Sequence, residues 1–402
     1  MSNPSLPVLR PEGASFFAVC TAGFLALAMA MGIGRFAFTP MLPLMVREGS
    51  LDISAGGWLA AANYAGYLLG AVTAARIGFT PQRLGLVALA GIVVTTAAMG
   101  WTHSVTLWLA LRFVAGVGSA WALVSTSVWG LAWLARFERP VGAGMLYAGV
   151  GAGIALAGLW CWQAGAAGVH GDALWLQLGA LALLLLVMVV LCMPRSMPDD
   201  ATQATAANRV GASGHTGSGA DWGLVLCYGV LGFGYILPAT FLPVLARAVV
   251  DDPAVFGAAW PVFGAAAALS TALASTLLRH VTRMRVLASC HALMAAGCLL
   301  PVLHLSAPTV LAAALLVGGT FMVATMAGMQ EARARAAGNP AAALGRMTAA
   351  FAMGQMAGPV LSSMLGGRSG DVHGLFMALA VGALALLASA VWLWRAPTKP
   401  TC

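Results

Sequence analysis

The chain is a succession of apolar runs, each about as long as the twenty residues that a helix needs to cross the hydrocarbon core of a bilayer. Twelve runs can be distinguished, at residues 15–46, 55–75, 84–101, 105–134, 140–163, 173–193, 222–246, 254–278, 286–303, 308–330, 341–365 and 373–394. Only 8% of the 402 residues are charged and 60% are hydrophobic, which leaves too little polarity to cover a soluble protein. We therefore predict an all-α membrane protein with twelve transmembrane helices.

The two halves of the chain are versions of one another. The segment MGIGRFAFTPMLPLMVR at residues 31–47 aligns without a gap with LGFGYILPATFLPVLAR at residues 231–247, so that Gly32 matches Gly232 and Arg47 matches Arg247. Parallel repeats with a binding site between them are common in secondary transporters. We therefore predict two pseudo-symmetric six-helix bundles, at residues 1–193 and 222–402. A cytoplasmic linker at residues 194–221, rich in Ala, Ser, Gly and Thr, would join them.

The basic residues are unevenly distributed between the two sides of the predicted helices. Fifteen of the twenty lysines and arginines fall in the termini or in the loops that follow even-numbered spans. Positively charged loops stay in the cytoplasm, so we expect a multi-pass protein of the inner membrane with both termini cytoplasmic. The net charge of +8 is then a topology signal rather than a sign of nucleic-acid binding. The expected partners are the lipid bilayer and a small-molecule substrate, with the protein itself a monomer.

The motifs of common membrane enzymes and pumps do not occur in the sequence. There is no Walker loop, HExxH, GxSxG or carboxylate cluster, and the seven cysteines form no CxxC or Cys/His ligand spacing. We therefore expect no enzymatic activity, no cofactor and no bound metal. The first apolar run is also longer than the core of a cleavable signal peptide, so we expect it to remain as the first helix.

The strongest candidate for a binding residue is Arg35. It lies about twenty residues into the first run, beside Phe36, and a rise of about 1.5 Å per residue places it deep in the membrane. Charge in hydrocarbon costs at least about 2.5 kcal/mol, so such residues usually face a wet cavity or a partner. A guanidinium stays charged and presents a planar fork of donors, which suits a carboxylate, sulfonate or phosphate. We predict that Arg35 binds an anionic group of the substrate; alternatively, it closes a structural network with helix carbonyls or another helix.

Other polar residues within the spans could complete such a pocket. Tyr235 is the counterpart of Arg35 in the second half, where it would offer a hydroxyl and a ring. Asn63 and Tyr67 lie four residues apart on one face of the second span, Tyr147 lies in the fifth and Gln355 in the eleventh. Each of these could equally form a hydrogen bond between helices. Four methionines could form an adaptable apolar wall of the pocket or could simply pack in the core: Met326, Met329, Met353 and Met356.

Twelve spans in two similar sixes, a long central linker and inward termini resemble the major facilitator superfamily. The sequence GIGRFAFTPMLPLM in the first span looks like the YbfB/YjiJ-type branch of that superfamily. The segment WLALRFVAGVGSA at residues 108–120 is similar to the superfamily's fourth-helix pattern, in which an arginine, here Arg112, precedes closely spaced glycines. The resemblance implies a carrier that works by alternating access. It links Arg112 to proton movement, although this side chain could equally pack against neighbouring helix ends.

The resemblance also suggests gating and hinge residues. The loop after the second span usually contains an aspartate–arginine pair that helps to hold the cytoplasmic side closed, but here Ala75 replaces the aspartate and Arg76 is kept. The fifth-span segment GAGMLYAGVGAGIALAG is similar to the hinge motif of the superfamily's exchangers, and a Gly-Pro pair occurs in the eleventh span. The hinge candidates are Gly149, Gly153, Gly358 and Pro359. These residues form a moving hinge or only allow close helix packing.

Proton coupling usually needs a titratable group inside the cavity. All twelve acidic residues fall in loops, termini or span ends, so Glu331, at the cytoplasmic end of the tenth span, is the fallback candidate for carrying a proton. His291 lies well inside the ninth span, which is generally peripheral in this fold, and we expect it to be packed or to face lipid. The remaining schemes are a facilitator, an exchanger of like-charged solutes, and a symporter whose anion arrives with its own proton.

These observations favour a secondary active or facilitative transporter that moves a small organic solute, in our interpretation an organic anion, across the inner membrane by alternating access. Two alternatives stay open. One is a multidrug-type exporter of hydrophobic compounds, in which Arg35 is structural and the methionines and aromatic residues bind the substrate. The other is a membrane sensor that does not transport.

Overall fold

The computed structural model describes residues 15–74, 76–137, 139, 141–194, 221–249, 253–277, 280–335, 340–365 and 372–396, and every regular element in this part of the chain is helical. The first half contains α1 (Phe16–Leu27), η1 (Ala28–Phe36), α2 (Phe38–Arg47), α3 (Ile53–Thr73), α4 (Pro81–Met99), α5 (Val105–Ala135), α6 (Val141–Ala166) and α7 (Gly171–Cys192). The second half contains α9 (Trp222–Val249), α10 (Pro253–Leu277), α11 (Arg283–Leu303), α12 (Ala307–Arg335), α13 (Pro340–Leu365) and α14 (Val372–Arg395). Most of the predicted linker lies outside the described residues.

Ten helical segments in the described part of the chain are long and apolar enough to cross a membrane. Helices α3 and α13 are not among these ten, although they contain 21 and 26 residues. Both are rich in alanine and glycine, and polar residues such as Asn63 and Gln355 lower their mean hydropathy further. The prediction of a helical membrane protein is therefore confirmed, while the count of twelve spans stays a prediction.

The first apolar run, which we expected to be one regular helix, is divided into three segments. Helix α1 continues into η1, a nine-residue π-helix, and the chain returns to α-helical geometry in α2. A π-helix shifts the backbone hydrogen bonds to i→i+5 and is frequent at functional sites. Pro40 lies in the first turn of α2 and has no backbone N–H, so one carbonyl in the preceding turn needs a donor from elsewhere.

Several helices begin at a residue whose side chain accepts a hydrogen bond from the first turn. Ser15 accepts from the backbone N–H of Ala18 at 3.1 Å, and Asp52 accepts from that of Ala55 at 2.6 Å. Such caps satisfy backbone donors that have no partner within the helix. The starts of α1 and α3 are therefore set locally by the sequence.

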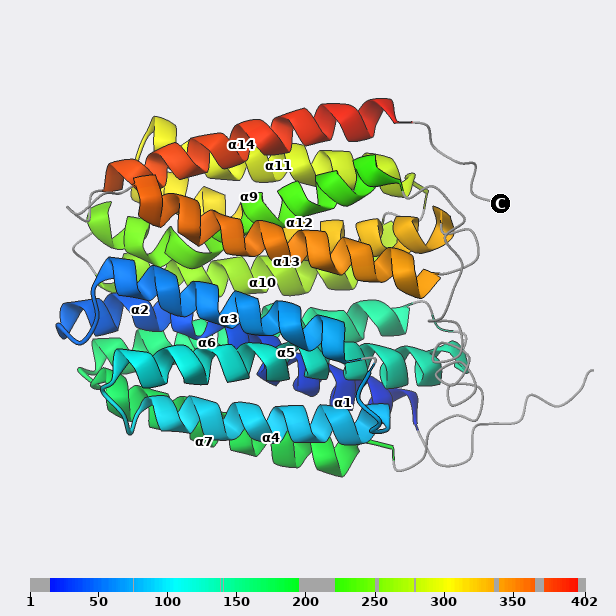
Figure 1. Cartoon of the computed structure of the whole chain (residues 1–402), viewed down its shortest axis with the longest axis horizontal. Coiled ribbons are helices and arrows are strands. Elements are labelled where there is room, and N and C mark those ends of the chain that lie inside the picture. Colours follow the sequence, from blue (N-terminus) through cyan, green and yellow to red (C-terminus); the bar gives the residue numbers. More distant parts are fainter. Residues whose placement is uncertain are drawn as a thin grey trace, which may run out of the picture.

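Helices of the same half of the chain lie together. In Figure 1, α9 to α14 occupy the upper part of the molecule and α1 to α7 the lower part. The two parts meet where α6 packs along α10 and where α3 packs along α13. A Cβ added to Gly151 of α6 or to Gly264 of α10 would overlap the backbone of the facing helix, so these two backbones are in direct contact.

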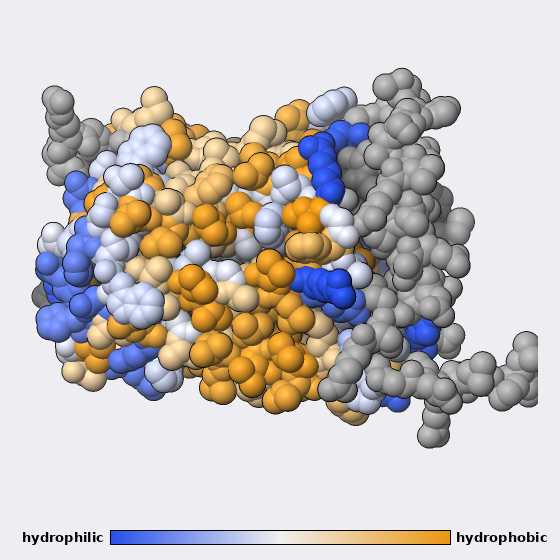
Figure 2. Space-filling view, turned by 60° about the horizontal axis from the view of Figure 1, so that its bottom comes forward, coloured by the Kyte–Doolittle hydropathy of each residue, from blue (hydrophilic) through white to orange (hydrophobic). Residues whose placement is uncertain are grey.

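The outer surface carries an apolar band. Figure 2 shows hydrophobic side chains gathered across the middle of the molecule and hydrophilic ones toward its two ends. Large apolar residues such as Leu183, Leu191 and Leu384 are more than half exposed, at 51%, 78% and 65%. An exposed apolar surface of this extent is expected of a protein surrounded by lipid.

Candidate functional site

Arg35 lies in η1, at the boundary between the two halves. Its Nη2 donates a hydrogen bond to Oε1 of Gln355 in α13, at 2.5 Å. The central carbon of the guanidinium lies 4.0 Å from the centre of the Tyr67 ring and 5.2 Å from that of Tyr64, both in α3. Only 2% of Arg35 is exposed. The charge is therefore buried, and its immediate neighbours are an amide and aromatic faces rather than a carboxylate.

The guanidinium of Arg35 keeps part of its hydrogen-bonding capacity. Its Nε and Nη1 have no hydrogen-bond partner among the described residues. Arginine presents five N–H donors and stays charged, and leaving a buried donor unpaired costs about 1–3 kcal/mol. Arg35 thus retains donors for a further acceptor, and a carboxylate matches the geometry of its planar fork.

Gln355 connects Arg35 to Tyr235. Its Nε2 donates a hydrogen bond to the hydroxyl oxygen of Tyr235 in α9. The ring of Tyr235 is stacked between Phe321 and Phe351, with ring centres 5.3 and 5.4 Å away. Three of the predicted residues, one from the first half and two from the second, therefore form one continuous hydrogen-bonded chain.

Two further hydrogen bonds join the halves close to this chain. The hydroxyl groups of Tyr64 and Thr240 are 2.9 Å apart, and Oγ1 of Thr39 donates to the carbonyl oxygen of Ala239 at 3.2 Å. Thr39 lies between Arg35 and the end of α2, which is the end that bears Arg47. Hydrogen bonds thus join the two halves both at Arg35 and further along the first span, toward Arg47.

Arg112 in α5 contacts the backbone of η1. Its Nη1 donates to the carbonyl oxygen of Gly34 at 3.2 Å, and its Nη2 donates to that of Arg35 at 2.8 Å. Asn63 donates from Nδ2 to the carbonyl oxygens of Arg112 and Gly34, at 2.9 and 3.5 Å. These side chains supply donors to the carbonyls near Pro40 and so stabilise the irregular turn. The contacts show Arg112 packed against the backbone of η1, and its role in moving protons stays a prediction.

Tyr147 forms its hydrogen bond away from Arg35. Its hydroxyl donates to Oγ of Ser127 at 2.8 Å, which joins α6 to α5 within the first half. Tyr67 contacts the guanidinium of Arg35 directly, whereas Asn63 and Tyr147 form hydrogen bonds with other partners. Their predicted contact with a ligand stays a prediction.

The glycines predicted to act as hinges lie at close helix contacts. A Cβ on Gly149 or Gly153 would overlap the backbone carbonyl of Phe24 or Ala28 in the first span. A Cβ on Gly358, next to Pro359 inside α13, would overlap the side chain of Ile236. These contacts account for glycine at each position by packing alone, and movement about them stays a prediction.

Glu331 belongs to a network of ion pairs at one end of the second half. It accepts a hydrogen bond from Nε of Arg335 at 2.8 Å and lies 3.9 Å from Nη1 of Arg283. Arg335 also binds Asp221, at 2.6 Å. Burial alone would lower the pKa of Arg335, but the hydrogen bonds and charges of Glu331 and Asp221 outweigh it and raise that pKa. Glu331 thus joins α12 to the start of α11, and Arg335 joins α12 to the start of α9. In the first half Arg76 is exposed beyond the end of α3.

The remaining candidates divide between buried and exposed positions. His291 in α11 is fully buried, and neither of its ring nitrogens has a hydrogen-bond partner in the described part of the chain. Met353 is 58% exposed, whereas Met326, Met329 and Met356 are partly buried against the apolar core. Met353 is thus placed on the outer surface, and the packed alternative for His291 agrees with its burial.

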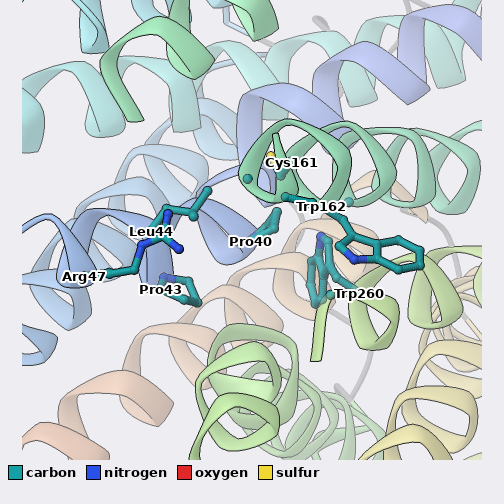
Figure 3. A pocket seen from close by; sticks show the side chains of 11 residues that line it. Pro40, Pro43, Leu44, Arg47, Cys161, Trp162 and Trp260 are labelled. Carbon is teal, nitrogen blue, oxygen red and sulfur yellow. The ribbon is translucent and has the colours of Figure 1, made fainter. Parts of the chain in front are cut away.

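A narrow cavity lies between the halves, beside α2 and beyond Arg35 along the first span. It has a volume of about 40 Å³, room for roughly two or three water molecules, and is lined by Pro40, Pro43, Leu44 and Arg47 of α2 together with residues of α6 and α10. Figure 3 shows Trp162 of α6 and Trp260 of α10 at this cavity. Arg35 does not line it, so the guanidinium is enclosed in this conformation.

Three residues of this site were not anticipated from the sequence. Tyr64 precedes Tyr67 by three residues, so helical spacing alone would have placed the two rings on neighbouring positions of one face. Phe321 and Phe351, which enclose Tyr235, belong to two different helices, and no local pattern distinguishes them from other core phenylalanines.

The comparisons with known proteins agree with this architecture. A family model described as "Uncharacterised MFS-type transporter YbfB" matches residues 27–393. This match covers the buried arginine, the π-helix and the helices that follow it in both halves, and it begins at the end of α1. The chain belongs to this family of the major facilitator superfamily.

One relative matches a shorter part of the chain. The "Uncharacterized MFS-type transporter YceJ" of Bacillus subtilis (strain 168) is 31% identical over 108 residues, which is 26% of this chain and 27% of the relative. The match thus spans about a quarter of either protein. With the apolar helices, the family assignment establishes a multi-pass membrane protein of the MFS transporter type and confirms the family predicted from the first span.

Proposed function

We propose that this MFS transporter moves a small organic anion across the inner membrane, as a secondary active or facilitative carrier with twelve spans in two pseudo-symmetric six-helix bundles. Both termini would be cytoplasmic, as the distribution of basic residues suggests. The single observation that carries the proposal is a buried guanidinium, at the boundary between the halves, two of whose nitrogens have no hydrogen-bond partner among the residues that the structure describes.

Alternating access would act on the contacts that cross this boundary. Arg35 belongs to the first half, and its hydrogen-bond acceptor Gln355 belongs to the second. When the halves rock apart on one side, the guanidinium loses that acceptor and faces the opening. An entering anion replaces the amide oxygen with a charged acceptor, which forms a stronger hydrogen bond. Arg112 stays bound to the backbone of η1 and keeps the turn that presents Arg35 in place.

The proposal is tested by substituting Arg35 in purified protein. A thermal-shift screen of small carboxylates and sulfonates identifies a ligand, since binding to the folded state raises the apparent Tm. Flux of that ligand is then measured in proteoliposomes that contain only this protein. We expect Arg35→Gln to abolish both binding and flux and Arg35→Lys to retain part of them, because lysine keeps the charge but not the fork.

Arg395→Gln is the matched control, since Arg395 is an exposed arginine at the end of α14. It should leave binding and flux unchanged. Undiminished flux of neutral or cationic hydrophobic compounds in Arg35→Gln would instead support a multidrug-type exporter. A total lack of solute flux would favour a non-transporting membrane protein.

A further inference from the structure

Six aromatic rings form a continuous row through the second half. Consecutive ring centres lie 4.9, 5.4, 5.3, 5.4 and 5.2 Å apart along Trp260, Phe263, Phe321, Tyr235, Phe351 and Tyr228. Four of these five contacts are stacked, with interplanar angles from 5° to 28°. The rings come from four helices, α9, α10, α12 and α13. We call these six residues the aromatic row, because each ring contacts the next.

This aromatic row lies next to the buried arginine. Tyr235, in the row, is linked through Gln355 to Arg35. The residue after Arg35, Phe36, contacts the row with its ring, which lies 6.1 Å from that of Trp260 and 6.5 Å from that of Phe321. The contact with Trp260 is tilted, with an interplanar angle of 56°, and the contact with Phe321 is edge-to-face, with an angle of 74°. The first half therefore contacts the row through the ring of Phe36, and Arg35 is connected to it through Gln355.

Separation of the halves would expose both partners at the same time. The row would lose the ring of Phe36, and Arg35 would lose the planar amide oxygen of Gln355. Exposing aromatic area and unpairing a buried donor are both unfavourable. A ligand that combines an aromatic ring with an adjacent planar oxygen acceptor restores both contacts, and ring–ring contacts add about 0.5–1.5 kcal/mol beyond area burial.

The charge of the ligand follows from the neighbouring arginine. Both terminal nitrogens of Arg112 are already bound to backbone carbonyls of η1. In Arg35, Nε and Nη2 lie on the same side of the guanidinium, so they form one pair of parallel donors once Gln355 releases Nη2. One such fork matches one carboxylate. The site therefore suits a monoanion better than a dianion or trianion.

We infer that the substrates are planar aromatic monocarboxylates, with the carboxylate on Arg35 and the ring against the aromatic row. This inference rests on the proposed function, because it specifies the anion that the same site takes. It adds a requirement that the guanidinium alone does not impose, namely that the body of the substrate be flat and aromatic.

Three probes of similar size separate the two requirements. Benzoate has the ring and the charge, cyclohexanecarboxylate has the charge without the ring, and benzamide has the ring without the charge. We expect benzoate to bind about three- to tenfold more tightly than cyclohexanecarboxylate, the range given by one or two ring contacts. Benzamide should bind more weakly than either carboxylate. Binding is measured by isothermal titration in detergent and by competition for flux in proteoliposomes.

Substitutions in the aromatic row test whether these rings cause the preference for benzoate over cyclohexanecarboxylate. Phe321→Leu and, independently, Phe351→Leu should reduce the preference for benzoate while binding of cyclohexanecarboxylate persists, which also shows that the variants are folded. Phe17→Leu is the control, because Phe17 is 67% exposed and has no contact with the row. It should keep the wild-type preference.

The outcomes distinguish this inference from the proposed function. Equal affinity for benzoate and cyclohexanecarboxylate would overturn the aromatic requirement and leave the organic-anion carrier intact. Benzamide binding as tightly as benzoate would overturn the anionic requirement and with it the proposed function. If none of the three binds, the aromatic-carboxylate inference fails, while the wider panel of carboxylates and sulfonates still decides the proposed function.

Discussion

Gln355 is the side chain whose replacement tests the connection between the halves most directly. It accepts a hydrogen bond from Arg35 at 2.5 Å and donates one to Tyr235. A buried hydrogen bond to a charged group contributes about 1.5–3 kcal/mol, which corresponds to about a tenfold to hundredfold change in an equilibrium. We call the conformation in which Arg35 and Gln355 are hydrogen-bonded across the two halves the connected conformation. Gln355→Leu should therefore reduce the equilibrium population of the connected conformation, relative to conformations in which the halves are apart, by about that factor.

Gln355→Glu should act in the opposite direction. It would place a carboxylate beside the guanidinium, and a charge-assisted hydrogen bond is stronger than one to an amide. The connected conformation should become more populated. The new carboxylate would also occupy the donors that we assign to the substrate, so that the apparent affinity for a carboxylate ligand falls by about tenfold or more.

Cysteines introduced at Thr39 and Ala239, with the native cysteines replaced, report on this equilibrium, because a hydrogen bond joins these two residues across the boundary. The rate of cross-linking should fall in Gln355→Leu and rise or persist in Gln355→Glu. Tyr147→Phe is the control, since it removes a 2.8 Å hydrogen bond that lies within the first half. Identical cross-linking rates in the wild type and in both Gln355 variants would refute the reasoning.

Three further predictions concern the helices that hold the site. Gly153→Val should lower the Tm by several degrees, because overpacking costs about 1–3 kcal/mol and the added side chain meets the backbone of Ala28; Gly91→Ala, where an added Cβ has no atom within 4 Å, should leave the Tm unchanged. Arg112→Lys should lower the Tm in thermal-shift measurements and weaken anion binding, since lysine replaces the two-pronged contact to the carbonyls of η1 with a single ammonium; unchanged binding would show that these contacts do not position Arg35. Glu331→Gln should lower the Tm, because it removes one partner of a part-buried ion pair, yet leave flux driven by a pH gradient intact; loss of that flux would make Glu331 a proton carrier instead.

The architecture could be predicted largely from the sequence. In a bilayer each backbone donor and acceptor must be satisfied within its own segment, so apolar runs of sufficient length become helices. The composition and the duplicated segment around Gly32 and Gly232 suggested the membrane environment and the superfamily. Arg35 was recognisable as a buried charge for the same reason, since its position along an apolar run determines its depth.

The sequence could not assign different roles to the two buried arginines. Arg112 and Arg35 both lie near the middle of apolar spans. Only packing between helices shows that both terminal nitrogens of Arg112 bind backbone carbonyls, whereas Arg35 binds the side chain of Gln355 from the other half. The π-helix was missed because its carbonyls take their donors from α3 and α5, which local periodicity does not report. The hydrogen bond from Arg35 to Gln355 joins residues 320 positions apart.

The sequence by itself thus indicated that the chain enters the bilayer, where its apolar helices lie along the chain and that a permanent positive charge is buried within the first of them, because these follow from the polarity of consecutive residues. The tertiary structure alone decided which side chains meet that charge and which rings stack beside it. Those contacts depend on the relative rotation and shift of helices from both halves, which is fixed by close packing at glycines such as Gly151 and Gly264.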